Sequence, residues 1–122
     1  MDTINRTTAC RAALYDLADT AVLRSSFLNS TLVVNATTVG MAPNINHSVL
    51  EDTSLFHSGL LVADIIYNPR ETQFLSRAKA AGCRTFNGLH MLLYQGAEAF
   101  RLWTGRQMPV KNIKEKYLSH CV

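Results

Sequence analysis

The hydrophobic pattern predicts strands wherever β-branched and aliphatic residues run together. Residues 31–35 read TLVVN and residues 60–66 read LLVADII, and each run ends at turn-forming residues. A run without alternation is typical of a strand buried on both faces, as in parallel sheets. A shorter run at residues 83–86 stops at Asn87-Gly88. These three runs are therefore predicted as strands.

Apolar residues at helical spacing predict helices at residues 20–28, 73–81 and 89–104, and a last one from Pro109 to about residue 119. Asp16 or Asp19 can cap the first helix, and Thr72 the second. Gly82 suits the C′ position that ends the second helix, and Pro109 the first turn of the last.

The helix after Gly88 is so apolar that we expect it to be largely buried. Gln95 lies in its middle, and a buried amide needs hydrogen-bond partners or costs about 1–3 kcal/mol. Gln95 is therefore expected either to tie down neighbouring backbone or to face a cleft that holds a polar ligand.

Three segments have weaker patterns. Residues 1–9 are polar and lack an apolar period, so an irregular start is expected, and residues 10–17 (CRAALYDL) fit a strand or a helix equally well. Residues 39–57 form a long loop with a weak helical turn near Val49-Leu50. Loops of this length are usually functional or mobile.

The alternation of strands and helices predicts an α/β fold with a mainly parallel sheet. Ligands of such sheets bind at the carboxyl ends of the strands. Three strand ends carry polar or glycine-bearing turns, at residues 35–41, 67–69 and 87–88. Each turn alone is ordinary turn chemistry, but three on one edge indicate a binding site.

Composition narrows the function. The chain has 122 residues, enough for one domain, with 48% hydrophobic and 17% charged residues. The net charge of +3 is spread along the sequence, so no nucleic-acid partner is expected. No apolar run reaches about 18 residues and no signal peptide opens the chain, so neither a membrane span nor secretion is expected.

No complete catalytic set is visible. The glycine-rich phosphate loops GxGxxG and GxxxxGK[ST] are absent, and a carboxylate inside a strand, as at Asp64, more often accepts nearby N–H bonds than acts as a base. The cysteines lack a CxxC pair, so reduced thiols in the cytoplasm are expected. The histidines lack ligand spacing, so no metal site is expected. The cysteines are Cys10, Cys83 and Cys121, and the histidines are His47, His57, His90 and His120.

Three segments together resemble the shikimate dehydrogenases, and most closely the quinate/shikimate dehydrogenase branch. They are residues 35–43 (NATTVGMAP), 60–72 (LLVADIIYNPRET) and 86–105 (FNGLHMLLYQGAEAFRLWTG), in the family's order and spacing. The resemblance runs from about Cys10 to the C-terminus and covers only the C-terminal half of such an enzyme.

The resemblance implies a partial Rossmann-like (doubly wound) sheet of about four strands, with flanking helices and a C-terminal helical pair at about residues 89–119. It implies reversible NAD- or NADP-dependent oxidation of shikimate or quinate to the 3-dehydro ketone, in aromatic amino acid biosynthesis or quinate metabolism. Residues 1–122 would be the C-terminal part of the NAD(P)-binding domain.

Site residues carried over from the family fall on the three turns. Thr38, Ile65, Ile66, Tyr67, Asn68 and Gly88 are expected to bind the dinucleotide near its nicotinamide end. Tyr67 and Gln95 are expected to face the substrate, with Gln95 hydrogen-bonding the oxygens of the ring.

Parts of the family pattern have no match in these residues. The substrate domain with its catalytic lysine and aspartate is missing, as is the first βαβ unit with its glycine-rich loop. Asn5-Arg6-Thr7 imitates the ribose-reading motif but stands at the wrong place in the strand order. We therefore expect no catalytic residue and no activity in the isolated chain. The choice between NAD and NADP, and between shikimate and quinate, stays open.

Losing two strands of the sheet would leave a buried strand with an open edge, which invites pairing. The expectation is that residues 10–17 pair with residues 31–35, or that the chain forms a homo-oligomer or pairs with a missing N-terminal half. The alternative function is a non-catalytic binding or interaction module on the same fold.

Overall fold

The computed structural model describes residues 2–118, and the chain divides into two compact units at Ser30. The first unit contains helices α1 (Asp2–Thr7) and α2 (Thr20–Leu28). The predicted cap of α2 is confirmed, since Asp19 Oδ1 accepts a hydrogen bond from Val22 N at 3.1 Å.

Two expectations for the first unit are wrong. The polar start forms helix α1, and residues 10–17 form neither a strand nor a helix. The side chain of Asn5 competes with regular structure at one of these residues, because its Oδ1 accepts from Ala12 N at 2.6 Å and its Nδ2 donates to Ala12 O at 3.0 Å. A single amide side chain thus satisfies both backbone groups of Ala12, which a strand would pair with a neighbour.

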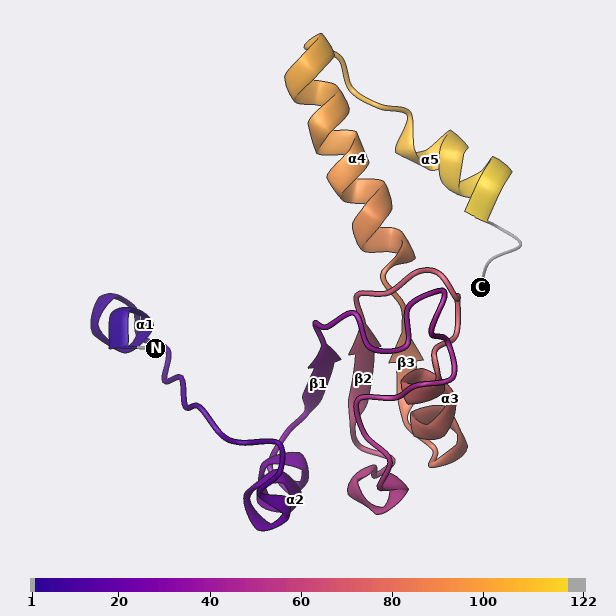
Figure 1. Cartoon of the computed structure of the whole chain (residues 1–122). Coiled ribbons are helices and arrows are strands. Elements are labelled where there is room, and N and C mark those ends of the chain that lie inside the picture. Colours follow the sequence, from indigo (N-terminus) through magenta and orange to yellow (C-terminus); the bar gives the residue numbers. More distant parts are fainter. Residues whose placement is uncertain (1, 119–122) are drawn as a thin grey trace. The chain divides into compact units, whose positions relative to one another are not determined.

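The second unit contains a parallel sheet of β1 (Leu32–Asn35), β2 (Leu61–Asp64) and β3 (Arg84–Phe86), in that order (Figure 1). The predicted α/β class is confirmed. The sheet has three strands rather than about four, because residues 10–17 contribute none. In register, Val34 lies beside Ala63 and Ala63 beside Phe86.

Strand β1 differs from its expected burial on both faces. Leu32 and Val34 are 49% and 48% exposed, and β2 is the one strand that pairs with β1 within residues 2–118. A continuous β-branched run therefore identified the strand, but it did not identify which side of it would be covered.

Helix α3 (Gln73–Ala80) supplies much of the core. Phe74, Leu75 and Ala78 are buried, as are Val62 of β2 and Leu60 directly before it. Both predicted ends are confirmed: Thr72 Oγ1 accepts from Leu75 N at 3.3 Å, and Gly82 has a positive φ of 85°.

The long loop before β2 is irregular except for a short 3₁₀ helix, η1 (Thr53–Leu55), which replaces the expected turn near Val49-Leu50. An arginine of α3 fastens the loop. The Arg77 guanidinium donates to Leu50 O at 2.9 Å and pairs with the Glu51 carboxylate at 2.5 Å.

Helix α4 (Leu89–Thr104) begins directly after Gly88 and ends at Gly105, whose φ is 68°. A shorter helix, α5 (Val110–Ile113), follows with Pro109 as its N-cap and continues as a π-helical turn (Lys114–Leu118). The predicted C-terminal helical pair is thus present as far as residue 118, and residue 119 lies outside the described range.

The expected burial of α4 is wrong, because none of its residues is buried. Figure 1 shows the reason: α4 extends from the carboxyl end of the sheet and does not lie across a face of it. Within residues 2–118 no helix is both long enough and apolar enough to span a membrane.

Candidate functional site

A groove of about 380 Å³ lies at the carboxyl edge of the sheet. It is formed by the turn after β1, the turn after β2 and the first turn of α4, so three segments far apart in sequence meet there. Its lining residues are Thr37, Thr38, Met41, Ala42, Ile65, Ile66, Tyr67, Asn68 and Met91. This volume is within the usual range for small-molecule sites.

Five of the residues expected at the dinucleotide lie together in this groove, namely Thr38, Ile65, Ile66, Tyr67 and Asn68. The parallel order of β1 and β2 explains this, because adjacent parallel strands deliver their following turns to the same edge. The two turns are also joined directly, since Ala42 N donates to Asn68 O at 3.2 Å.

Gly88 lies at the junction between β3 and α4, next to the groove. Its N–H donates to Ile66 O at 3.0 Å, and a Cβ at this position would lie 1.8 Å from Ile65 O. Only glycine can therefore bring the start of α4 this close to the turn after β2. The contact is with the chain's own backbone, which is a reason for glycine that the sequence had not indicated.

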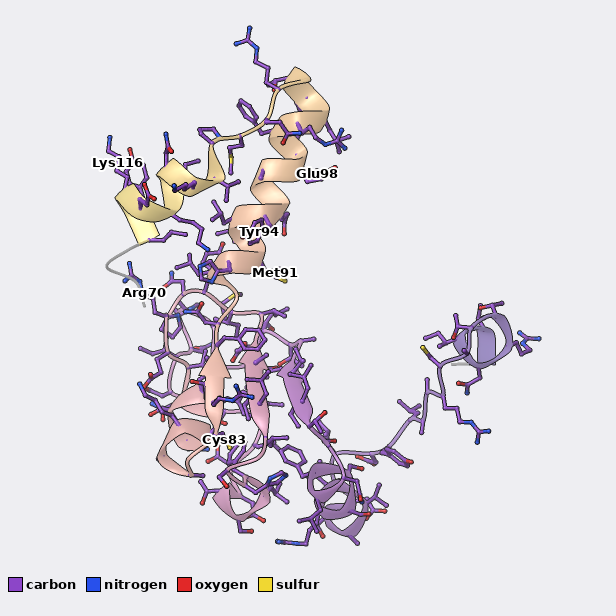
Figure 2. All side chains as sticks on the ribbon, turned by 180° about the vertical axis from the view of Figure 1, so that it is seen from behind. Arg70, Cys83, Met91, Tyr94, Glu98 and Lys116 are labelled. Atoms are coloured by element: carbon purple, nitrogen blue, oxygen red, sulfur yellow. The ribbon has the colours of Figure 1, made fainter. Side chains whose placement is uncertain are left out.

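Gln95 does not line the groove. It is exposed, so the expectation of a buried amide is wrong, for the same reason that α4 as a whole is exposed. Gln95 follows Met91 by four residues and so lies on the same side of α4, one turn further from the junction. Figure 2 shows Met91 at the end of α4 that adjoins the strand-end loops.

Met91 is the lining residue that sequence reasoning missed on α4. Its spacing of four residues from Gln95 was a usable signal, because residues four apart share a helix face. Thr37, Met41 and Ala42 were also missed, although they belong to the turn that contains Thr38.

Asp64 acts as a hydrogen-bond acceptor beneath the groove and not as an exposed base. Its carboxylate is buried and accepts from Ile66 N at 3.0 Å and from the Thr72 hydroxyl at 2.8 Å. This confirms the structural interpretation of a carboxylate inside a strand.

Asn87 holds the other side of the junction. Its Nδ2 donates to Arg70 O at 2.8 Å, and its Oδ1 accepts from Leu89 N at 3.1 Å. The amide side chain thereby satisfies a backbone donor at the start of α4, where Gly88 has no side chain to do so.

No group of three metal-ligating side chains occurs in the described part of the chain. Cys10 is exposed and Cys83 is buried, and Cys83 Sγ donates to His57 O at 3.2 Å. Burial raises the pKa of the Cys83 thiol. Figure 2 places Cys83 at the end of the sheet opposite Met91. His120 and Cys121 lie outside the described residues.

Comparison with known proteins finds the same family in sequence and in structure. Residues 88–116 match the family model described as "Shikimate 5'-dehydrogenase C-terminal domain". A quinate/shikimate dehydrogenase of Escherichia coli O139:H28 is 43% identical over 112 residues. The chain is a homologue of the C-terminal part of the shikimate dehydrogenases. The matched region is 92% of this chain and 39% of that relative, so the chain spans less than half of the relative's length.

Solved structures of the family agree with this assignment. Shikimate 5-dehydrogenase from Listeria monocytogenes, in complex with shikimate and NAD, has a TM-score of 0.86 and 42% identity. That match covers 93% of this chain and 39% of the Listeria chain. Quinate dehydrogenase from Corynebacterium glutamicum, in complex with NAD, has a TM-score of 0.65 and 36% identity, covering 80% and 34% of the two chains. The expected resemblance and the Rossmann-like fold are both confirmed.

Proposed function

We propose that this chain supplies the NAD(P)-binding part of a quinate/shikimate dehydrogenase, with residues 1–122 belonging to one cofactor domain. Such an enzyme reversibly oxidises shikimate or quinate to the 3-dehydro ketone with NAD or NADP. The observation that carries the proposal is the meeting of Thr38 and the turn from Ile65 to Asn68 in one groove. Relatives solved with NAD, and with NADP(H) and shikimate, support it.

The groove suits the nicotinamide end of the cofactor. Ile65, Ile66 and Met91 provide apolar surface for a flat ring, and Thr38 and Asn68 provide polar groups that can orient a carboxamide. Bound there, the nicotinamide would supply the hydride acceptor or donor of the reaction. This chain's residues bind the ring, orient it and shield one side of it from water.

Tyr67 and Gln95 are proposed to contact the substrate. Tyr67 lines the groove, and Gln95 lies further along the side of α4 that carries Met91. A phenol and an amide can both donate and accept hydrogen bonds, as recognition of a ring with several hydroxyls requires. Proton transfer from the reacting hydroxyl is proposed to need residues outside these 122, because the lysine and aspartate that the family resemblance implies have no match here.

A fluorescence titration with NADH tests the binding proposal. We expect saturable binding by the 122-residue chain and its loss in Thr38→Phe, in which the larger side chain would fill the groove. Thr104→Phe is the matched control, because Thr104 is an exposed threonine at the far end of α4. Equal binding by both variants would contradict the assignment of the groove.

An activity assay tests whether the chain needs an N-terminal substrate domain for turnover. We expect no shikimate-dependent reduction of NAD⁺ or NADP⁺ by the chain alone, and measurable reduction after mixing with the N-terminal domain of the E. coli relative. Turnover by the isolated chain that Gln95→Ala abolishes would show that these residues suffice.

A non-catalytic interaction module is the second candidate. Exposed apolar side chains on α4, such as Leu102 and Trp103, favour it because they offer surface for association with another polypeptide or with a second copy. The same mixing experiment separates the candidates, since a pure interaction module would form a complex without restoring turnover.

A further inference from the structure

We propose that Asp64 is the positioning residue of the groove, holding both of its turns through one buried carboxylate. This role rests on the proposed function, because the two turns would form part of the nicotinamide site. Asp64 is the last residue of β2, directly before the lining residues Ile65 and Ile66.

The carboxylate is 2% exposed and accepts three hydrogen bonds. Its Oδ1 accepts from the backbone N–H of Ile66 at 3.0 Å, which fixes the turn after β2. Its Oδ2 accepts from Thr72 Oγ1 at 2.8 Å and from Asn35 Nδ2 at 3.2 Å. One side chain therefore connects the groove to the start of α3 and to the end of β1.

Asn35 extends the effect of Asp64 to the other turn. It is 3% exposed and lies directly beside Asp64 in the register of β1 and β2. Its Oδ1 accepts from both Thr37 N at 3.1 Å and Thr37 Oγ1 at 2.7 Å, and its Nδ2 also donates to Val39 O at 3.3 Å. Thr37 lines the groove, so the orientation of the Asn35 amide sets one of its walls.

The chemistry of this pair requires an acceptor without donors at position 64. An ionised aspartate only accepts, and it meets three donors here, whereas an asparagine carries two N–H groups of its own. In Asp64→Asn the new NH2 group would face the Ile66 N–H in one orientation of the amide and the Asn35 Nδ2 donor in the other. If Asn35 turned over to relieve that contact, its own Nδ2 would face the Thr37 N–H. One atom change beneath the groove thus disturbs both turns.

NADH titration of Asp64→Asn tests the role. We expect the dissociation constant for NADH to rise about tenfold, equivalent to about 1.4 kcal/mol, under conditions where circular dichroism shows the variant folded. Amide hydrogen exchange at Thr37 and Ile66 should accelerate, since each N–H would lose an ordered acceptor. Unchanged affinity together with unchanged exchange would overturn the proposal.

Two control variants separate positioning from general stability. Thr72→Val removes one donor to the same carboxylate and the cap of α3, but no bond to either turn, so it should destabilise the fold and leave the NADH dissociation constant within about threefold. Asp52→Asn alters an aspartate that accepts from Ser54 N at 2.9 Å outside the groove, and it should leave affinity and exchange unchanged. A loss of affinity in Thr72→Val as large as in Asp64→Asn would show a merely structural role.

The double variant Asn35→Asp/Asp64→Asn gives the sharpest result. It exchanges donor and acceptor, so the bond between the two side chains can re-form while Oδ1 of residue 35 still accepts from Thr37. We expect it to recover part of the lost affinity, and no recovery would count against the pair as the cause. If Asp64→Asn does not fold, Asn35→Ala takes its place with the same expected loss. Absence of NADH binding by the native chain would instead contradict the proposed function, and exchange at Thr37 and Ile66 would then decide the role of Asp64.

Discussion

The sheet with α3 and the helix α4 both carry apolar side chains, and of these only side chains of the sheet and α3 are buried in the structure. Phe74 and Val62 are almost completely inaccessible to solvent, whereas α4 contains no buried residue and its Trp103 is 84% exposed. An apolar sequence shows that a helix can be buried. Whether other residues cover it depends on where the helix lies in the fold. The groove lies where these two regions meet, with its strand-end turns on packed elements and Met91 on the exposed helix.

The junction between the two regions should be the most sensitive position. We expect Gly88→Ala to lower the free energy of unfolding by about 4 kcal/mol or more, because its Cβ would lie 1.8 Å from Ile65 O and the start of α4 would have to move. Gly96→Ala, inside α4, should instead stabilise by about 0.5–1 kcal/mol, because among the described residues the added Cβ would meet nothing within 4 Å beyond its chain neighbours and its own helix backbone. Urea unfolding of both variants checks this. Equal effects would remove the distinction between junction and helix.

Core and helix should differ nearly as much when an aromatic ring is removed. Phe74 is 1% exposed and its ring centroid lies 5.8 Å from that of Phe56, so Phe74→Ala should cost about 3–5 kcal/mol. Trp103→Ala on α4 should change stability by no more than about 0.5 kcal/mol. Thermal and urea unfolding measure both. A large loss for Trp103→Ala would show that α4 is covered in solution.

The smallest effect is expected at the buried thiol. Burial raises the pKa of Cys83 in the folded chain, so the unfolded thiol, with a pKa of about 8.5, ionises first. The stability due to the neutral thiol is therefore present below about pH 8.5 and is lost as the pH rises towards the folded pKa. Unfolding free energies measured from pH 7 to 10 should fall more steeply for the native chain than for Cys83→Ala, and parallel curves would contradict this.

Labelling with iodoacetamide gives a second measure of the burial of Cys83. The exposed Cys10 should react well before Cys83 in the folded chain, because the thiolate is the nucleophile and burial suppresses it. Peptide mass spectrometry resolves the two sites. Equal rates would show that the Cys83 region opens readily.

Local signals predicted the elements of the second unit well. Thr72 caps α3, Gly82 follows it with positive φ, and Gly105 ends α4 in the left-handed conformation. Each of these depends on one residue and its immediate neighbours in sequence, so no knowledge of distant contacts was needed. The predictions that failed concerned burial. Helix α4, Gln95 and strand β1 were expected to be buried, and burial depends on which other residues pack against an element.

Some residues of the candidate site were likewise predicted from the sequence, and others were found only in the structure. The resemblance to the shikimate dehydrogenases named Thr38, the turn from Ile65 to Asn68, and Gly88, and these residues form or adjoin a single groove. The link from Asp64 through Asn35 to Thr37 was not visible in sequence. It depends on strand register and on the direction of buried side chains, which no local pattern encodes.

The sequence by itself determined which segments from α2 onwards become the main strands and helices, where most of them end, and to which family the chain is related. Those properties follow from propensities, caps and motif spacing, which act over a few residues. The tertiary structure decided which apolar faces are covered, why position 88 has room only for glycine, and how one carboxylate reaches both turns of the groove. These require atoms from distant parts of the chain to approach within hydrogen-bonding or van der Waals distance, and that approach exists only in the folded molecule.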